Sequence, residues 1–167
     1  MRQLRALRSG ACTVSSMSER VVAVDLGATW QPSVPDAVLI AGDEVATVLA
    51  LNAHFDDPDQ RCVVMTWKHA RTACKSPPND EAISGHRLWR RGLSDVLWVG
   101  VVEDSELIAA LEQQNRVHAR HDPARFRDLV HHVMRLKECV VEVISEGLTV
   151  HRLDGSTIEA ASAAARR

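Results

Sequence analysis

The most regular feature of the chain is a series of short apolar segments that predict β-strands. Each segment is rich in β-branched or other apolar residues, and residues typical of turns lie between them. The polar segment 54–60, for example, separates the first two segments and predicts the loop that connects them. The predicted strands span residues 45–51, 62–67, 96–102 and 148–153.

One substantial helix is predicted after the third of these strands. Asp104 or Ser105 can cap its first turn, and the pattern permits a stop at Asn115. An acidic residue follows the cap, as the helix dipole favours. The dipeptide Asp122-Pro123 repeats the start signal, but the short charged segment behind it predicts only one or two further turns. The apolar stripe of the main helix consists of Leu107, Ile108 and Leu111.

Residues 129–146 predict a β-hairpin with a tight turn near Glu138-Cys139. A two-residue turn there would pair opposite charges across the strands, with Arg135 opposite Glu142 and His131 opposite Glu146. Successive side chains alternate between the two faces of a strand, so His131 and His132 are not expected to be core residues together. His132 shares a face with apolar neighbours and is predicted to be the inward one.

Strands in series with one main helix predict the α+β class. We expect an antiparallel β-sheet or a partly open barrel covered by that helix. No glycine-rich phosphate loop follows any predicted strand, which argues against the common nucleotide-binding folds. We expect residues 1–20 to be a disordered arm or an over-extended start, residues 21–155 to form a single domain and residues 156–167 to be an Ala-rich tail or a frayed helix.

Composition and charge narrow the classes of partner. The formal net charge is −2, but without residues 1–20 and the two last arginines 14 basic residues face 21 acidic ones. An acidic body argues against nucleic acid as a partner. No apolar run is long enough to span a membrane, and no export signal is recognisable, so we expect a cytoplasmic protein with its cysteines reduced. The excess of arginine over lysine suggests a bacterial origin.

Two polar, irregular stretches, residues 77–92 and 115–122, are the predicted functional region, because long loops in compact domains are often functional. Carboxylates and imidazoles in them can serve as general acids and bases, and a guanidinium can hold a carboxylate or phosphate. The candidate catalytic residues are Asp80, Glu81, His86 and His118. The candidate substrate-binding residues are Asn79, Trp89, Asn115, Arg116, His121 and, from the hairpin, His132. We assign no metal ligands, and no cofactor follows from the sequence.

Structural explanations compete with each of these roles. Asp80 can cap a short helical turn instead of acting as a base. Arg116 and Arg120 can pair with Asp80 and Glu81, which would make the two loops a brace rather than a site. The four tryptophans can line a ligand pocket or fill the core.

A set of short motifs in the second half of the chain resembles a pattern carried by a family of small uncharacterised bacterial proteins. The resemblance spans roughly residues 67–146 and implies no particular fold, activity or cofactor. It adds weight to the two loops. The residues that carry it are Pro78-Asn79-Asp80-Glu81-Ala82, Gly85-His86, Gly92-Leu93, Asn115-Arg116-Val117-His118, His121 and His132.

These observations favour a protein that binds a small-molecule ligand, and an enzyme using His, Asp and Glu as acid–base groups is one form of that function. The pocket is expected where loops 77–92 and 115–122 meet. The alternative is a non-catalytic interaction or homodimeric structural domain that uses Trp89-Arg90-Arg91 as a contact surface. A homodimer formed through an open sheet edge is compatible with either function.

Overall fold

The computed structural model describes residues 19–43 and 45–167, which form nine strands and three α-helices. The strands are β1 (Arg20–Val24), β2 (Val38–Ile40), β3 (Thr47–Leu51), β4 (Cys62–Lys68), β5 (Thr72–Ser76), β6 (Val99–Glu103), β7 (Val130–Arg135), β8 (Val140–Ser145) and β9 (Gly147–Leu153). The α-helices are α1 (Glu106–Asn115), α2 (Ala124–Arg127) and α3 (Thr157–Ala165), and three 3-10 turns are η1 (Ile83–Gly85), η2 (Trp89–Arg91) and η3 (Leu93–Asp95).

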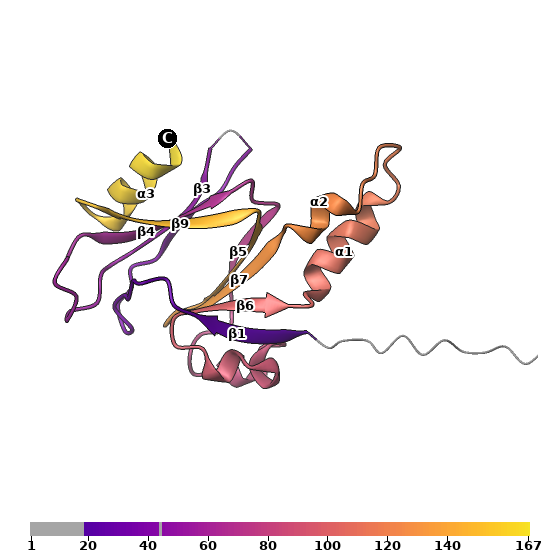
Figure 1. The fold of residues 1–167 in the computed structure, drawn as a ribbon. Helices are drawn as coiled ribbons and strands as arrows, with labels where there is room; N and C mark the ends of the chain where they lie inside the picture. Colours follow the sequence, from indigo (N-terminus) through magenta and orange to yellow (C-terminus); the bar gives the residue numbers. More distant parts are fainter. Residues whose placement is uncertain (1–18, 44) are drawn as a thin grey trace, which may run out of the picture.

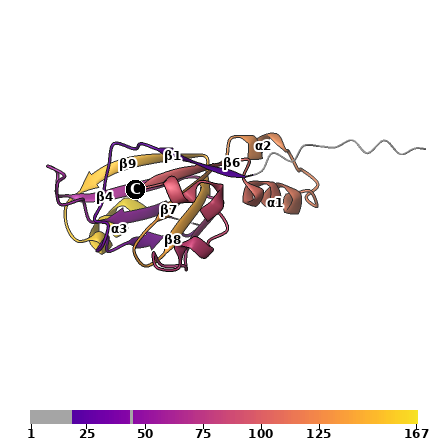
Figure 2. The ribbon, with the colours of Figure 1, turned by 90° about the horizontal axis from the view of Figure 1, so that it is seen from below.

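The strands form two antiparallel sheets that face one another without closing into a barrel (Figures 1 and 2). The five-stranded sheet has the order β1-β6-β7-β8-β5, and the four-stranded sheet has the order β2-β3-β4-β9. Strand makes up 34% and helix 22% of the structure, with one main helix packed on a sheet. The predicted α+β class is therefore confirmed, in its open-sheet form, although the helix that covers a sheet is α3 and not the predicted helix after β6.

The main core lies between the two sheets. Every residue of β3 is buried, and Leu49 of β3 and Met65 of β4 pack in one cluster with Met134 of β7 and Val141 of β8. These side chains come from alternate positions of both sheets, as expected for two facing pleated layers. A strand buried on both faces reads as a continuous apolar run, which explains why β3 and β4 were recognisable in the sequence.

Helix α3 covers the outer face of the four-stranded sheet and is not a tail. The hydroxyl of Ser156, the N-cap residue, accepts from the Glu159 backbone N–H, and the Glu159 carboxylate accepts from the Ser156 N–H. These two contacts form a complete capping box. Buried alanines pack on the sheet, where their small size lets helix and strands approach closely: Ala160, Ala161, Ala164 and Ala165 join Val48, Ala50 and Val64 in one cluster. The segment predicted to be an Ala-rich tail is thus part of the packed fold.

The segment holding η1, η2 and η3 covers the other face of the five-stranded sheet, below β1 in Figure 1. Leu88 and Leu93 are fully buried there against Val102 and Val133. Gly92 makes this possible, because its φ is +108° and a Cβ added to it would lie 2.5 Å from the Val21 carbonyl oxygen. The predicted polar loop is therefore an ordered cover with an apolar underside.

Helices α1 and α2 project from the end of the sheets (Figure 1). Ser105 caps α1 by accepting from the Ile108 backbone N–H, as predicted, but α1 has no buried residue. Helix α2 is a single short turn after Asp122-Pro123, which also agrees with the prediction. We call residues 104–129, which comprise both helices and their connection, the arm.

Three details differ from the sequence-based expectations. The β7–β8 register pairs Arg135 with Val140 and His131 with Ile144, two residues away from the predicted pairing, because the turn centres on Lys137-Glu138. Strands β1, β2 and β5 were not predicted. Most of the expected arm at 1–20 lies outside the described residues, although Glu19 is buried and Arg20 begins β1.

No helix within the described residues has the length and apolar character needed to cross a membrane.

Candidate functional site

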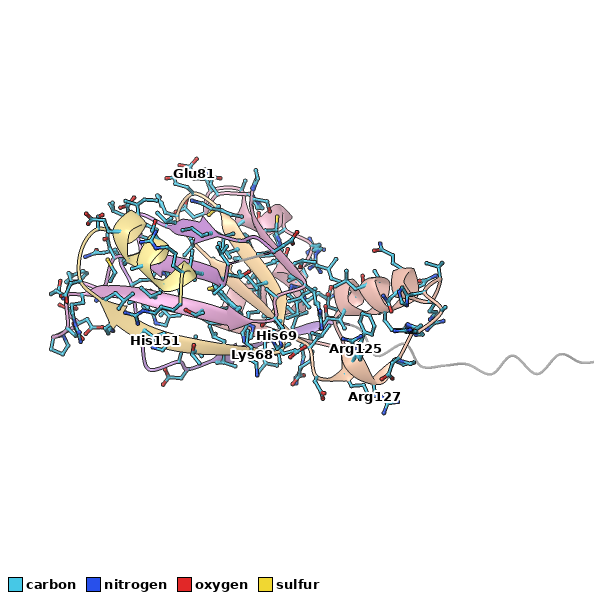
Figure 3. The ribbon with its side chains drawn as sticks, turned by 90° about the horizontal axis from the view of Figure 1, so that it is seen from above. Lys68, His69, Glu81, Arg125, Arg127 and His151 are labelled. Carbon is cyan, nitrogen blue, oxygen red and sulfur yellow. The ribbon has the colours of Figure 1, made fainter. Side chains whose placement is uncertain are left out.

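The two loops proposed from the sequence do not come together. The segment around η1 and η2 lies below β1 in Figure 1, whereas the α1–α2 connection lies at the far end of the arm. Figure 3 likewise places Glu81 well away from Arg125 and Arg127 of α2. The central strands of the five-stranded sheet separate the two segments. The single pocket expected where these loops meet is not formed.

In the first loop, residues 77–92, several of the predicted side chains form hydrogen bonds with neighbouring groups. The Asn79 carboxamide oxygen accepts from the Ala82 backbone N–H at 3.3 Å, so Asn79 rather than Asp80 caps the turn. Lys137 donates to Asp80 at 2.7 Å and holds the pKa of that carboxyl below its ordinary value. Glu81 is exposed. The Asp80 carboxylate is thus paired with the β7–β8 turn, not with an arginine of the second loop.

In the second loop, Glu112 of α1 organises the predicted residues. Arg116 donates to its carboxylate at 2.7 Å, and His121 Nε2 lies 2.9 Å from its other oxygen. His121 Nδ1 also lies 3.0 Å from the Asn115 side-chain oxygen. The Arg116 hydrogen bond and charge lower the pKa of Glu112, with His121 adding to the effect. Arg116 therefore neither faces Asp80 and Glu81 nor stands free as an anion clamp.

His118 lies at the exposed tip of the same loop. Its Nδ1 accepts from the Arg120 backbone N–H at 3.1 Å, a local contact that stabilises the turn. The structure gives His118 no contact with the other candidate catalytic residues within the described part of the chain.

His86 belongs instead to a buried polar cluster centred on Glu142 of β8. His86 Nε2 lies 3.7 Å from one carboxylate oxygen of Glu142, and His131 Nε2 lies 3.0 Å from the other. Arg87 bridges this carboxylate and that of Glu19, which is almost fully buried. Burial opposes ionisation of Glu142, but the contacts with His131, His86 and Arg87 outweigh it and leave its pKa well below the ordinary value.

Glu142, Glu19 and Ser105 were not predicted to belong to a polar cluster. They lie on β8, before β1 and before α1, and only the pairing of β6, β7 and β8 brings these segments together. Spacing along the chain carries no signal for such a cluster. The one signal in the sequence was Glu142 itself, a charged residue within the otherwise mostly apolar strand β8.

His132 faces the opposite way, into the core between the sheets. Its ring lies 6.3 Å from that of Trp67, and its Nδ1 has no hydrogen-bond partner among the described residues. Burial, with the nearby His131, lowers its pKa to about 4. Both His131 and His132 are buried, because this sheet is covered on both faces, so the expectation that only His132 points inward is wrong. The structure places His132 in the core rather than beside a pocket.

Two cavities adjoin the arm. A groove of about 630 Å³ runs between α1 and the ends of β6 and β7, and Ser105, Ile108, Phe126, Leu129 and His131 are among its lining residues. A second pocket of about 400 Å³ lies between the arm and the turn that joins β4 to β5, and its lining consists of Arg71, Leu111, Gln114, Asn115, Arg125 and Phe126. Phe126 contributes to both.

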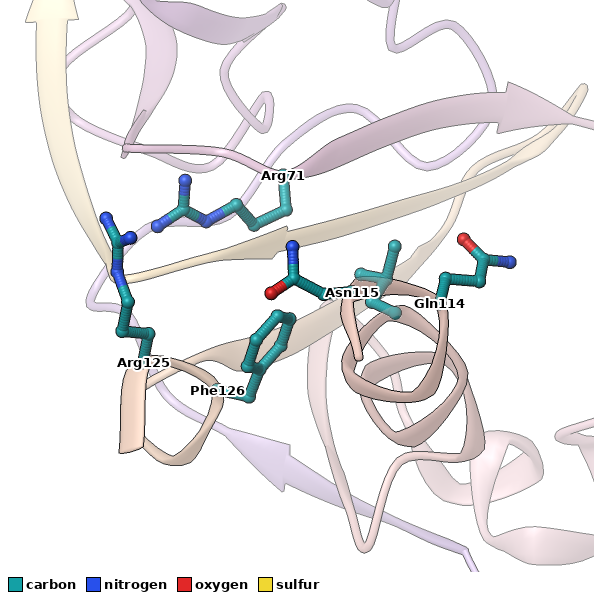
Figure 4. Close-up of a pocket in the computed structure, with 6 residues that line it drawn as sticks. Arg71, Gln114, Asn115, Arg125 and Phe126 are labelled. Atoms are coloured by element: carbon teal, nitrogen blue, oxygen red, sulfur yellow. The ribbon is translucent and has the colours of Figure 1, made fainter. Parts of the chain in front are cut away.

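The second of these cavities, here called the arginine pocket, has a cationic side and an apolar side. Figure 4 shows the Arg71 and Arg125 guanidiniums at one side of it, with the Asn115 amide and the Phe126 ring facing them. Arg71 donates to Glu146 at 3.1 Å. Arg125 forms no ion pair with any residue that the structure describes. Asn115 is the one predicted site residue among those that line this pocket.

A third cavity, of about 400 Å³, is lined by the indoles of Trp30, Trp89 and Trp98 together with Asp80 and Arg135. The rings are already in contact with other groups: Trp30 and Trp98 meet edge to face at 5.1 Å, and the Arg135 guanidinium lies 5.7 Å from the Trp89 ring centre. Trp89 is half-buried in this lining and does not form the flat exposed surface that the alternative interaction function requires.

The described residues contain no group of three or more His, Cys, Asp or Glu side chains arranged to hold a metal ion. No protein-family model matches the chain, and no curated protein or solved structure is significantly similar to it.

Proposed function

We propose that this protein binds a small organic anion, a carboxylate or phosphate with an apolar part, in the arginine pocket. The observation that carries the proposal is the convergence of two guanidiniums from separate elements, Arg71 and Arg125, on a pocket whose opposite wall is the Phe126 ring. Planar guanidiniums suit carboxylate and phosphate oxygens, and an aromatic wall suits the apolar remainder of such a ligand.

The local charge balance supports an anion rather than a neutral ligand. Among the described residues Glu146 is the one carboxylate paired with Arg71, and Arg125 has no acidic partner, so the two guanidiniums share a single carboxylate. Lys68, at the end of β4, adds a further cation to the same edge (Figure 3). The chain as a whole has a net charge of −2, so this cationic edge is a local exception. The Asn115 amide adds a hydrogen-bonding group that a charged ligand can use.

The test compares phenyl phosphate with phenol by calorimetric titration of the full chain. We expect phenyl phosphate to bind with one-to-one stoichiometry and phenol to bind far more weakly. Arg125→Gln should weaken phenyl phosphate binding by about tenfold or more, because it removes one charge-assisted contact. Arg127→Gln is the matched control, since Arg127 lies on the same short helix but does not line the arginine pocket.

Three outcomes would contradict the proposal. These are no binding of phenyl phosphate to the folded protein, equal affinity for phenol and phenyl phosphate, and equal weakening of binding by the two arginine variants. Inorganic phosphate, titrated alongside, distinguishes the contribution of the charged group from that of the ring. Binding should also weaken as salt concentration rises, because the ligand contact is ionic.

A further inference from the structure

The groove beneath α1 contains a serine, a histidine and a carboxylate in series. Ser105 Oγ lies 2.8 Å from His131 Nδ1, and His131 Nε2 lies 3.0 Å from Glu142 Oε2. Three separate elements supply these groups: the residue that caps α1, strand β7 and strand β8. None of these three side chains lines the arginine pocket.

The surrounding charges favour the protonation pattern that a nucleophilic serine needs. The Glu142 carboxylate, held by Arg87, lies 3.0 Å from His131 Nε2 and electrostatically favours the ring tautomer with its proton on that nitrogen. Nδ1 is then free to accept from Ser105. The Ser105 oxygen already accepts from the Ile108 N–H at 3.3 Å, so its own hydroxyl hydrogen is available for Nδ1. The Nε2–carboxylate contact is close but not aligned as a hydrogen bond.

The local backbone also suits a reactive serine. Ser105 stands between the end of β6 and the first turn of α1, and Asp104 before it has a φ of +51°, a strained conformation for a residue other than glycine. The amino-terminal amides of α1 carry partial positive charge that can stabilise a developing oxyanion. Glu19 accepts the Glu106 N–H and Ser105 accepts the Ile108 N–H, whereas within residues 19–43 and 45–167 nothing accepts the Leu107 N–H.

The groove offers room for an apolar acyl group next to the serine. Ser105 and His131 both line it, and Ile108, Phe126 and Leu129 supply apolar walls within a volume of about 630 Å³.

We propose that Ser105, His131 and Glu142 form a nucleophile–base–carboxylate triad that hydrolyses esters with an apolar acyl group. Ser105 Oγ attacks the ester carbonyl carbon while its proton passes to His131 Nδ1, and Glu142 stabilises the resulting imidazolium. Collapse of the tetrahedral intermediate breaks the bond to the alcohol, which leaves with the proton from Nδ1. Water then attacks the acyl-serine and gives a proton to Nδ1, which returns it to Ser105 Oγ as the carboxylic acid departs.

The first test uses the unmodified full chain with p-nitrophenyl butyrate and with a fluorophosphonate probe. We expect release of p-nitrophenolate above the buffer rate and a covalent phosphonate adduct on the peptide that contains Ser105, located by mass spectrometry. A purely structural serine, however well it caps α1, would give neither signal. Absence of both from a folded sample would overturn the proposal.

The second test separates catalysis from helix capping. Ser105→Asn keeps a side-chain oxygen for the cap but removes the nucleophile, and should lower ester hydrolysis by about 10³-fold or more and abolish labelling. Glu142→Gln should lower hydrolysis by roughly 10²-fold. Ser94→Ala, in the exposed turn η3, is the matched control and should leave the rate unchanged. Full activity in a folded Ser105→Asn protein would also overturn the triad.

Discussion

The two-sheet body and the α1–α2 arm differ sharply in how they are held. In the body, β3 is buried along its whole length, and α3 buries most of its alanines on the sheet beneath it. In the arm, α1 buries no residue, and its connection to α2 is held mainly by the carboxylate of Glu112. The body therefore rests on apolar burial, which contributes most to stability, whereas exposed ion pairs contribute little.

This difference indicates that the two regions contribute differently to the proposed sites. Both proposed sites lie where the arm meets the body, and each takes some groups from the arm and some from the body. Regions with few buried contacts open at low free-energy cost, and ligand-binding elements are often drawn from them. The rigid strands β7 and β8 hold His131 and Glu142 in place, while the lightly packed arm can adjust around a ligand.

The largest expected contrast is between equivalent leucine truncations in the two regions. Leu49→Ala, in fully buried β3, should lower the free energy of unfolding by about 2–5 kcal/mol through lost burial and the cavity left behind. Leu111→Ala, at a half-buried position of the otherwise exposed α1, should cost about 1 kcal/mol or less. Urea unfolding followed by circular dichroism measures both. Equal losses would mean that the arm is as tightly integrated as the body.

A second contrast concerns the pH dependence of stability, because the body buries His132 in its core. The pKa of buried His132 is lowered from 6.5 to about 4, so between these values the unfolded chain binds a proton that the folded chain does not. Stability should therefore fall as pH decreases from 6.5 to 4, by up to about 3 kcal/mol from this residue. His132→Leu should flatten that part of the stability curve, measured by urea unfolding at several pH values.

Val133→Ala, on the same strand as His132, is the control for this pH experiment. It removes a buried side chain but no titratable group, so it should lower stability by a similar amount at every pH and leave the slope between pH 4 and 6.5 unchanged. Glu142 acts in a separate window: its lowered pKa makes stability fall further only as pH drops below the ordinary range of a glutamate. An unchanged slope in His132→Leu would refute the assignment.

A third contrast compares the two longer helices. Ala161→Leu adds volume to the closed contact between α3 and the four-stranded sheet, and should destabilise the fold by about 1–3 kcal/mol. Ala110→Leu, at an exposed position of α1, should change stability by no more than about 0.5 kcal/mol. Thermal unfolding of the two variants side by side provides the measurement. A neutral Ala161→Leu would show that α3 is only loosely docked.

The smallest expected effect lies wholly within the arm. Glu112→Gln removes the carboxylate that holds Arg116 and His121, but should leave global stability nearly unchanged, since such surface pairs contribute little. Amide hydrogen exchange should instead become faster in residues 116–122. A large global loss without a local change in exchange would contradict the proposed independence of the arm.

The parts of the fold that were predictable from the sequence are those with strong local signals. Strands β3, β4 and β9 are apolar runs between turn residues, and Ser105 is a recognisable cap for α1. Strand β5 escaped prediction because it is a short, mostly polar edge strand, and the β7–β8 register was missed because Lys137-Glu138 lacks the residues that fix tight turns. The alanines of α3 were ambiguous because alanine suits both exposed and buried helix positions.

The candidate site was less predictable, for a physical reason. From the sequence, only residues that are close along the chain could be assigned to a common site, such as those in residues 77–92 and 115–122. The structure shows that the close contacts are made across strands, where His131 and Glu142 meet Ser105 from a different segment. Asn115, by contrast, lies at the end of α1, whose last turns form one wall of the arginine pocket. The individual roles assigned to Asp80, Glu81, His86 and His118 stay predictions, as does a homodimer formed through a free sheet edge.

The arrangement of β7 also turns two neighbouring residues into separate reporters. His131 faces the groove beneath α1, and His132 faces the interior between the sheets. In an isotope-edited spectrum, solvent that enters when the arm lifts would perturb the first ring and leave the second unchanged. Solvent that enters when the sheets part would perturb the second. Isotope labels on these two adjacent histidines can therefore distinguish an opening motion of the arm from the onset of unfolding.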